Sequence, residues 1–159
     1  MQIEMTIKLM VDPITNLPII LLRDRDGQRV LPIWVGASEA NAIALQIENI
    51  TTPRPMTHDL LRNVIHDLKA EIRKVVVSDL KDNTFYALIY LSVNGEAMAI
   101  DARPSDAIAL ALRARAPIFV EDTVIDNAKT VDFAPEKRDS ELQKWLESLD
   151  PNDMGKYKM

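Results

Sequence analysis

The residues best placed for chemistry lie together in Ile100-Asp101-Ala102-Arg103-Pro104-Ser105-Asp106. Asp101 ends an expected strand, Arg103 follows on a loop, and Ser105 and Asp106 open an expected helix. Free backbone amides and the helix dipole favour an anion at a helix start. Carboxylates beside an arginine there can hold a divalent metal, Mg²⁺ or Mn²⁺, together with a phosphate. We therefore expect Asp101 and Asp106 to bind metal, and Arg103 and Ser105 to contact phosphate.

A purely structural interpretation of the same residues stays open. Ser105 can simply cap the helix, and the charge of Asp106 can complement the helix dipole. Asp101 and Arg103 can form an ion pair whose only role is to hold the loop. The spacing of these residues is compatible with both interpretations.

The chain also repeats itself at an offset of 67 residues. Segment 38–45 aligns with segment 105–112, with five of eight positions identical and Glu39 in the place of Asp106. Residues shared by two units are expected to serve packing, so those that differ are better candidates for function. If the units face each other about a pseudo-twofold axis, Glu39 and Asp106 converge in one cleft. Glu39 then becomes a further catalytic carboxylate and metal ligand.

The segment that joins the units, Arg54-Pro55-Met56-Thr57-His58-Asp59, adds further candidates. Thr57 is expected to cap a helix. His58 suits a general acid or base because its reference pKa lies near neutrality, and Asp59 beside it is another candidate catalytic carboxylate. Arg54 is expected to bind phosphate oxygens through its planar guanidinium. The alternative for His58 is a solvated surface residue in the first helical turn.

Each unit predicts three strands followed by a helix. The first has strands over 2–11, 17–22 and 29–35 and a helix from Ser38 to about Asn49; the second has strands over 74–79, 85–93 and 96–102 and a helix after Ser105. Residues 107–112 are only Ala, Ile and Leu, so the second helix should be nearly enclosed. The joining helix has an apolar face formed by Leu60, Leu61, Val64, Ile65 and Leu68.

These elements predict one α+β domain over 1–130. Its units span about 2–50 and 70–117, a helix over 57–70 joins them, and helices pack on a mixed or antiparallel sheet. An extension over 131–159 carries an amphipathic helix at 140–149 that includes Trp145. The apolar stripe of this helix packs either on its own domain or on a partner subunit, and the second case makes the protein a homo-oligomer.

Composition limits the classes of function. The 159 residues have a net charge of -5, so binding nucleic acid requires a local basic face. Cysteine is absent, which excludes disulfides and thiolate metal sites. The N-terminal residues show neither a signal-peptide core nor a membrane span, so we expect a cytoplasmic protein without membrane contact.

Three separated motifs resemble the bifunctional nuclease family, over about Met1 to Asp126. They are Leu31-Pro32-Ile33-Trp34-Val35-Gly36 with Glu39-Ala40, then Arg54-Pro55-x-Thr57-His58-Asp59-Leu60, and then Ile100-Asp101-Ala102-Arg103-Pro104-Ser105-Asp106-Ala107-Ile108-Ala109-Leu110. The resemblance implies an α+β fold built by duplication and the ability to degrade both RNA and DNA.

Cleavage of both polymers cannot depend on the 2′-hydroxyl, which DNA lacks. Such an enzyme must supply its own nucleophile, most simply a metal-activated water. The candidate catalytic residues are then Asp101, Asp106, Glu39, His58 and Asp59. The alternative is a non-catalytic regulatory or binding module, in which Arg103 and the helix start capture a phosphorylated or carboxylated ligand.

Overall fold

The computed structural model describes residues 1–26, 29–128 and 131–132. Its strands are β1 (Gln2–Val11), β2 (Pro18–Asp24), β3 (Arg29–Trp34), β4 (Ala70–Lys81), β5 (Thr84–Val93), β6 (Glu96–Ala102), β7 (Ile118–Glu121) and β8 (Val131–Asp132). Its helices are α1 (Ala37–Ile47), α2 (Thr57–Asp67), α3 (Pro104–Ala114) and α4 (Asp122–Asn127). The predicted helix at 140–149 lies outside the described residues.

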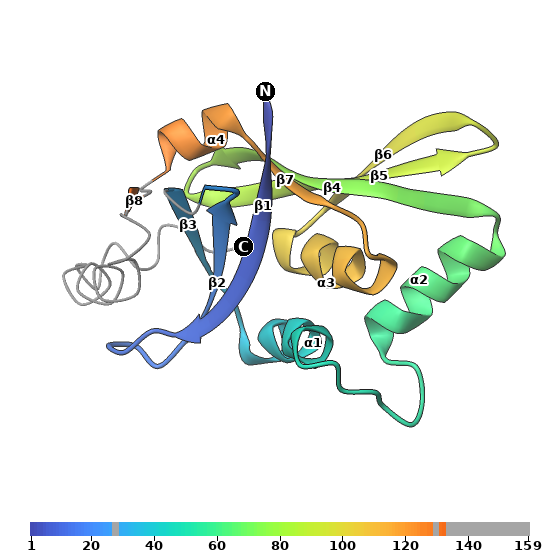
Figure 1. Ribbon diagram of the computed structural model, residues 1–159, viewed down its shortest axis with the longest axis horizontal. Helices are drawn as coiled ribbons and strands as arrows, with labels where there is room; N and C mark the ends of the chain where they lie inside the picture. Colours follow the sequence, from blue (N-terminus) through green and yellow to red (C-terminus); the bar gives the residue numbers. More distant parts are fainter. Residues whose placement is uncertain (27–28, 129–130, 133–159) are drawn as a thin grey trace.

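Within the described residues the strands form a single sheet of eight, in the order β6-β5-β4-β7-β1-β2-β3-β8. The short strand β7 joins the two halves, because it pairs antiparallel with β1 and parallel with β4. The α+β class and the mixed sheet are therefore confirmed (Figure 1). The order of three strands and a helix occurs twice, as β1-β2-β3-α1 and β4-β5-β6-α3. Its origin by duplication stays a prediction.

The sequence Asn94-Gly95 between β5 and β6 is typical of a tight hairpin turn, and the two strands pair antiparallel. Asn94 and Gly95 both adopt positive φ, 52° and 81°, as the tight turn between β5 and β6 requires. The pairing of β2 with β3 is also antiparallel. Residues 27–28, between these two strands, lie outside the described residues.

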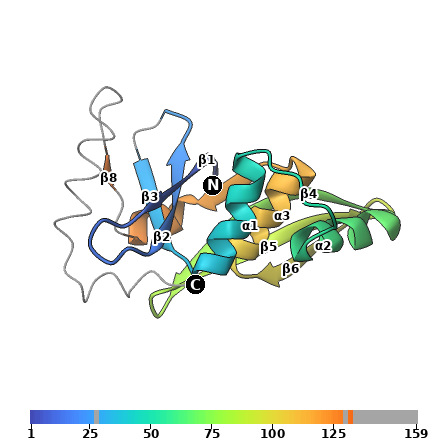
Figure 2. The same ribbon diagram turned by 90° about the horizontal axis from the view of Figure 1, so that it is seen from below.

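Helix α3 is the most enclosed helix in the described part of the chain. Its residues from Ala107 to Ala111 are at most 2% exposed, and among the strands α3 contacts mainly β4 and β5. This confirms the prediction made from the run of Ala, Ile and Leu. Figure 2 shows α1 and α3 side by side between the strands of the first half and those of the second.

The predicted helix starts need correction. The N-cap of α1 is Gly36 rather than Ser38, that of α2 is Met56 rather than Thr57, and that of α3 is Arg103 rather than Ser105. In each case the hydroxyl residue already lies within the helix. At α3 the reason is Pro104, whose fixed φ suits the first helical position.

The apolar face of α2 is only partly covered. Ile65 packs against the core, whereas Leu60, Leu61, Val64 and Leu68 are between 40% and 72% exposed. The reason is position, because α2 lies beside β4 at one end of the molecule rather than across the sheet (Figure 1). No helix in the described ranges is long and apolar enough to cross a membrane.

Candidate active site

The starts of three helices meet at one cavity of about 540 Å³, here called the active-site cavity. Glu39 lies in the first turn of α1, His58 in the first turn of α2, and Arg103 and Asp106 at the start of α3. The full lining is Ser38, Glu39, Asn41, Ala42, Leu45, Met56, Thr57, His58, Arg103, Asp106 and Arg113. Residues from both units and from the joining helix therefore share one cavity.

Arg103 links the two carboxylates that the sequence repeat makes equivalent. Its Nε donates to Asp106 Oδ2 at 2.9 Å, and its Nη1 donates to Glu39 Oε1 at 3.2 Å. The predicted convergence of Glu39 and Asp106 is thus confirmed. In the described part of the chain Arg103 Nη2 makes no hydrogen bond, and the side chain is 53% exposed. One face of the guanidinium therefore remains available to a ligand.

His58 contacts the other oxygen of Asp106. His58 Nε2 and Asp106 Oδ1 are 2.9 Å apart, and the two side chains are 15% and 35% exposed. With Asp106 ionised, a neutral His58 donates its Nε2–H to the carboxylate, which leaves the lone pair on Nδ1. No described residue hydrogen-bonds Nδ1. His58 can therefore accept a proton at Nδ1 while Asp106 holds the ring.

Asp106 is stabilised in its ionised form. Burial alone raises its pKa, but hydrogen bonds from Arg103 and His58 and the charges of these groups outweigh burial and lower the pKa below 3.8. The carboxylate is therefore negative at neutral pH, as an acceptor for both donors must be.

The predicted metal ligands are not assembled as a group. Among the described residues no cluster of three or more His, Asp or Glu side chains could hold a metal ion. The guanidinium of Arg103 lies between Glu39 and Asp106, where a cation bound by both would lie. Asp101 instead lines a separate, mainly apolar groove with His58 and Asp106. The set Asp101, Asp106 and Glu39 does not fit a metal in this arrangement.

Asp101 also lacks the structural partner considered for it. The Arg103 side chain pairs with Asp106 and Glu39, and no described residue forms an ion pair or side-chain hydrogen bond with Asp101. The alternative of an Asp101–Arg103 ion pair is therefore wrong. Asp101 lies on the exposed edge strand β6, beside the site but outside its hydrogen-bonded cluster.

The Asp59 carboxylate makes structural hydrogen bonds and does not line the active-site cavity. Its Oδ2 accepts the Met56 N–H at 2.9 Å, and its Oδ1 accepts Arg113 Nε at 2.7 Å. Burial acts to raise the pKa of Asp59, but these hydrogen bonds and the charge of Arg113 lower it. Both oxygens are occupied, which does not support the predicted catalytic role of Asp59.

Arg113 was missed by sequence reasoning. Its side chain is 1% exposed, and Nη1 also donates to the Ala109 carbonyl at 2.9 Å. A signal was present, because Arg113 directly follows the apolar run 107–112 of an enclosed helix. An arginine at such a position requires a carboxylate or carbonyl partner nearby.

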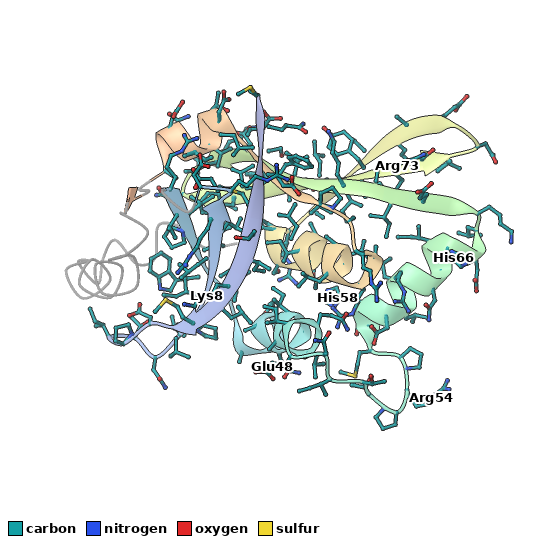
Figure 3. All side chains as sticks on the ribbon, viewed as in Figure 1. Lys8, Glu48, Arg54, His58, His66 and Arg73 are labelled. Atoms are coloured by element: carbon teal, nitrogen blue, oxygen red, sulfur yellow. The ribbon has the colours of Figure 1, made fainter. Side chains whose placement is uncertain are left out.

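Two predicted phosphate contacts lie away from the active-site cavity. Ser105 is 1% exposed, so it is not positioned to touch a substrate. Arg54 lies on the loop before α2 (Figure 3). It lines a second cavity together with Arg62. His66, the other histidine, lies at the far end of α2 from His58 (Figure 3). Of the predicted residues, the structure joins Glu39, His58, Arg103 and Asp106.

Comparison with known proteins identifies the family. The profile of the bifunctional nuclease domain matches residues 20–132. The chain belongs to the bifunctional nuclease family. The resemblance of the three motifs is therefore confirmed, and the matched range of this bifunctional nuclease domain includes Glu39, His58, Arg103 and Asp106.

Relatives of the domain differ in what is known of them. A protein of Mycobacterium tuberculosis described as uncharacterized is 42% identical over 142 residues, which is 85% of each chain. Bifunctional nuclease 1 of Oryza sativa subsp. japonica is 29% identical over 112 residues, or 68% of this chain and 34% of its own length. Bifunctional nuclease 1 of Arabidopsis thaliana is 31% identical over 107 residues, or 65% and 33%. This chain thus matches about a third of each plant protein.

Proposed function

We propose that this chain is a nuclease that hydrolyses phosphodiester bonds of RNA and DNA at the active-site cavity. Its family membership and its plant relatives named bifunctional nucleases support this assignment. The observation that carries the proposal is the His58–Asp106 pair beside Arg103. These residues combine a proton acceptor, a group that orients it and a cation with an unused donor, at one open cavity.

The reaction can proceed with water as the nucleophile. His58 Nδ1 takes a proton from water as the water oxygen bonds to phosphorus, and the bond from phosphorus to the leaving sugar oxygen breaks. The leaving oxygen then takes a proton from solvent. Asp106 keeps the imidazole oriented and stabilises its protonated form, while Arg103 Nη2 binds a phosphate oxygen. No step uses the 2′-hydroxyl, so both polymers are substrates.

The dependence on Mg²⁺ or Mn²⁺ is a separate proposal. No step above passes through a metal, because Arg103 already holds Glu39 and Asp106. Chelation by EDTA tests this dependence directly. Cleavage that persists in EDTA agrees with the geometry described, whereas its loss shows that a metal displaces Arg103 or binds elsewhere.

The alternative of an anion-binding module at the start of α3 is less well supported. Two carboxylates, Glu39 and Asp106, hydrogen-bond the one guanidinium of Arg103. The start of α3 therefore offers one free donor, Arg103 Nη2, but little net positive charge to hold a phosphorylated or carboxylated ligand by this contact alone. The nuclease proposal also gives a role to the hydrogen bond between His58 and Asp106, which anion binding at α3 does not require.

The test is cleavage of labelled single-stranded RNA and DNA by highly purified protein, with EDTA or with Mg²⁺ or Mn²⁺. We expect the wild type to cut both polymers and His58→Gln to lose at least about a hundredfold in rate. His66→Gln is the matched control, because it changes the other histidine of the same helix. A contaminating nuclease cuts equally in all preparations. Pure wild type that cuts neither polymer overturns the proposal.

A further inference from the structure

A second cavity, of about 290 Å³, lies beside the active-site cavity and is here called the arginine cavity. It is bounded by the end of α1, the loop before α2, the start of α2 and the end of α3. The lining is Leu45, Gln46, Ile50, Thr51, Thr52, Pro53, Arg54, Pro55, Asp59, Arg62, Asn63 and Arg113. Three guanidinium groups and one carboxylate line it, so it has an excess of two positive charges in a chain of net charge -5.

Among the described residues, two of the three guanidinium groups form no ion pair with a carboxylate. Arg113 is bound by Asp59. In the described part of the chain Arg62 donates only to the Asn63 side-chain oxygen, at 3.1 Å from Nη2 and 3.4 Å from Nε, and to the Arg113 carbonyl, at 3.4 Å from Nη1. The exposed side chain of Arg54 makes no hydrogen bond or ion pair within the described ranges. Arg54 and Arg62 thus form no ion pair within these ranges, although the charge of Arg62 helps to lower the pKa of Asp59. Their positive charge favours an anion in the arginine cavity.

The arginine cavity adjoins the active-site cavity. Leu45 and Arg113 line both. The consecutive residues His58 and Asp59 line one cavity each, so the two spaces flank the same first turn of α2. Two cavities that share lining residues are neighbours on the surface, as the sites for two phosphates of one strand must be.

We propose that the arginine cavity is a second phosphate site, in which Arg54 and Arg62 hold a phosphate that flanks the cleaved bond of the same strand. This inference rests on the proposed nuclease function and adds a subsite to it. Planar guanidinium groups bind phosphate oxygens bidentately. Such contacts position a strand without reading base or sugar, which suits a substrate class that includes RNA and DNA.

Salt-dependent binding tests the site. The probe is a fluorescein-labelled single-stranded oligodeoxynucleotide with cleavage-resistant phosphorothioate linkages, titrated with the full chain at several salt concentrations. Arg54→Gln and Arg62→Gln are each expected to weaken binding about tenfold and to reduce the salt slope by about 0.7, the value of one phosphate contact on a single strand. The matched control is Arg73→Gln on β4, because Arg73 pairs with Glu71 at 3.4 Å and lies away from Arg54 (Figure 3).

Substrate length gives an independent readout. For an oligonucleotide, Arg62→Gln should raise KM about tenfold with little change in kcat, because the contact holds a phosphate that does not react. A dinucleoside monophosphate has no flanking phosphate, so its KM should change less than about twofold in the same variant. Thermal midpoints of all variants confirm that they are folded.

The outcomes separate the two proposals. Wild type that cuts and binds, with both variants no weaker than Arg73→Gln, overturns the second phosphate site alone. Equal KM changes for the dinucleotide and the oligonucleotide do the same. Inorganic phosphate that raises the thermal midpoint of wild type, without any oligonucleotide effect, identifies a free anion as the occupant and also overturns the site proposed. Wild type that neither binds nor cuts overturns the nuclease function and this subsite together.

Discussion

The two strand-to-helix junctions of the fold use the same positions for different purposes. Gly36 and Arg103, 67 residues apart, are the N-caps of α1 and α3, and Glu39 and Asp106 each follow three residues later. A Cβ atom at Gly36 would collide with Glu39 Oε2. At the second junction Arg103 instead extends its side chain to both carboxylates. The repeat thus provides two equivalent carboxylates, Glu39 and Asp106. Arg103, which replaces the Gly36 of the first unit, provides the cation that both carboxylates bind.

The carboxylates themselves are unequal for the same reason. Glu39 is bound by Arg103, whereas Asp106 is bound by Arg103 and by His58. The joining helix places His58 against Asp106, in the second unit. The proposed chemistry therefore depends on the second junction more strongly than on the first, and this asymmetry can be tested by changing each part.

The largest effect is expected on stability, near the C-terminal end of α3, at a position where the residue differs from its equivalent in α1. Arg113 occupies the position equivalent to Gln46, and its buried charge depends on Asp59. Asp59→Ala should lower the free energy of unfolding by about 3–5 kcal/mol, because it leaves a buried charge without a partner. Urea denaturation measures this loss. The double variant Asp59→Asn with Arg113→Gln should recover part of the stability, and no recovery contradicts the assigned pair.

Arg103→Gly converts the second junction into the first and removes the shared cation. We expect kcat/KM for a single-stranded oligonucleotide to fall by about a hundredfold, through the lost phosphate contact and the unscreened Glu39 and Asp106. Arg103→Lys should fall less, because it keeps the charge but not the planar fork. An activity of Arg103→Gly close to wild type would contradict the role given to this residue.

Low pH should reduce the contribution that Asp106, at the second strand-to-helix junction, makes to the stability of the fold. Because the pKa of Asp106 is lowered in the folded state, its ionisation stabilises the fold above the ordinary pKa of 3.8, and this contribution is lost as pH falls through the lower folded value. The stability difference between wild type and Asp106→Asn should therefore shrink as the pH is lowered below about 4. Thermal unfolding at a series of pH values measures it. A stability difference between wild type and Asp106→Asn that stays constant down to pH 2 would contradict this expectation.

The smallest effect is expected from Gly36→Ala at the first junction. The added methyl group must displace the flexible Glu39 carboxylate, and alanine is a poorer N-cap than glycine. We expect a loss of about 0.5–1 kcal/mol in unfolding free energy and only a severalfold decrease in kcat/KM. An activity loss as large as that of Arg103→Gly would show that Glu39 matters as much as the cation.

Much of this architecture could be predicted from sequence because the signals are local. Alternating strands, the Asn94-Gly95 turn and the apolar run 107–112 each act over a few residues. The internal repeat extends further and correctly predicts that Glu39 and Asp106 converge. Hydroxyl residues misled the prediction of the helix starts, because Ser38 and Thr57 resemble N-caps that the backbone places elsewhere.

Pairing across the fold could not be predicted in the same way. His58 and Asp106 are 48 residues apart in sequence, and only the packing of α2 against α3 brings them together. Arg103 pairs with Glu39 and Asp106 rather than with its near neighbour Asp101, because this choice depends on where α1 lies. The exposed face of α2 likewise follows from the position of that helix, which its apolar pattern does not specify.

The most direct test of the asymmetry is to compare kcat/KM for Asp106→Asn and Glu39→Gln on the same single-stranded oligonucleotide. Both changes remove one charge from one carboxylate bound by Arg103, and both proteins must first be shown to be folded. We expect a loss of at least about a hundredfold for Asp106→Asn and at most about tenfold for Glu39→Gln. Equal losses, or an Asp106→Asn variant that cuts like wild type, would contradict it.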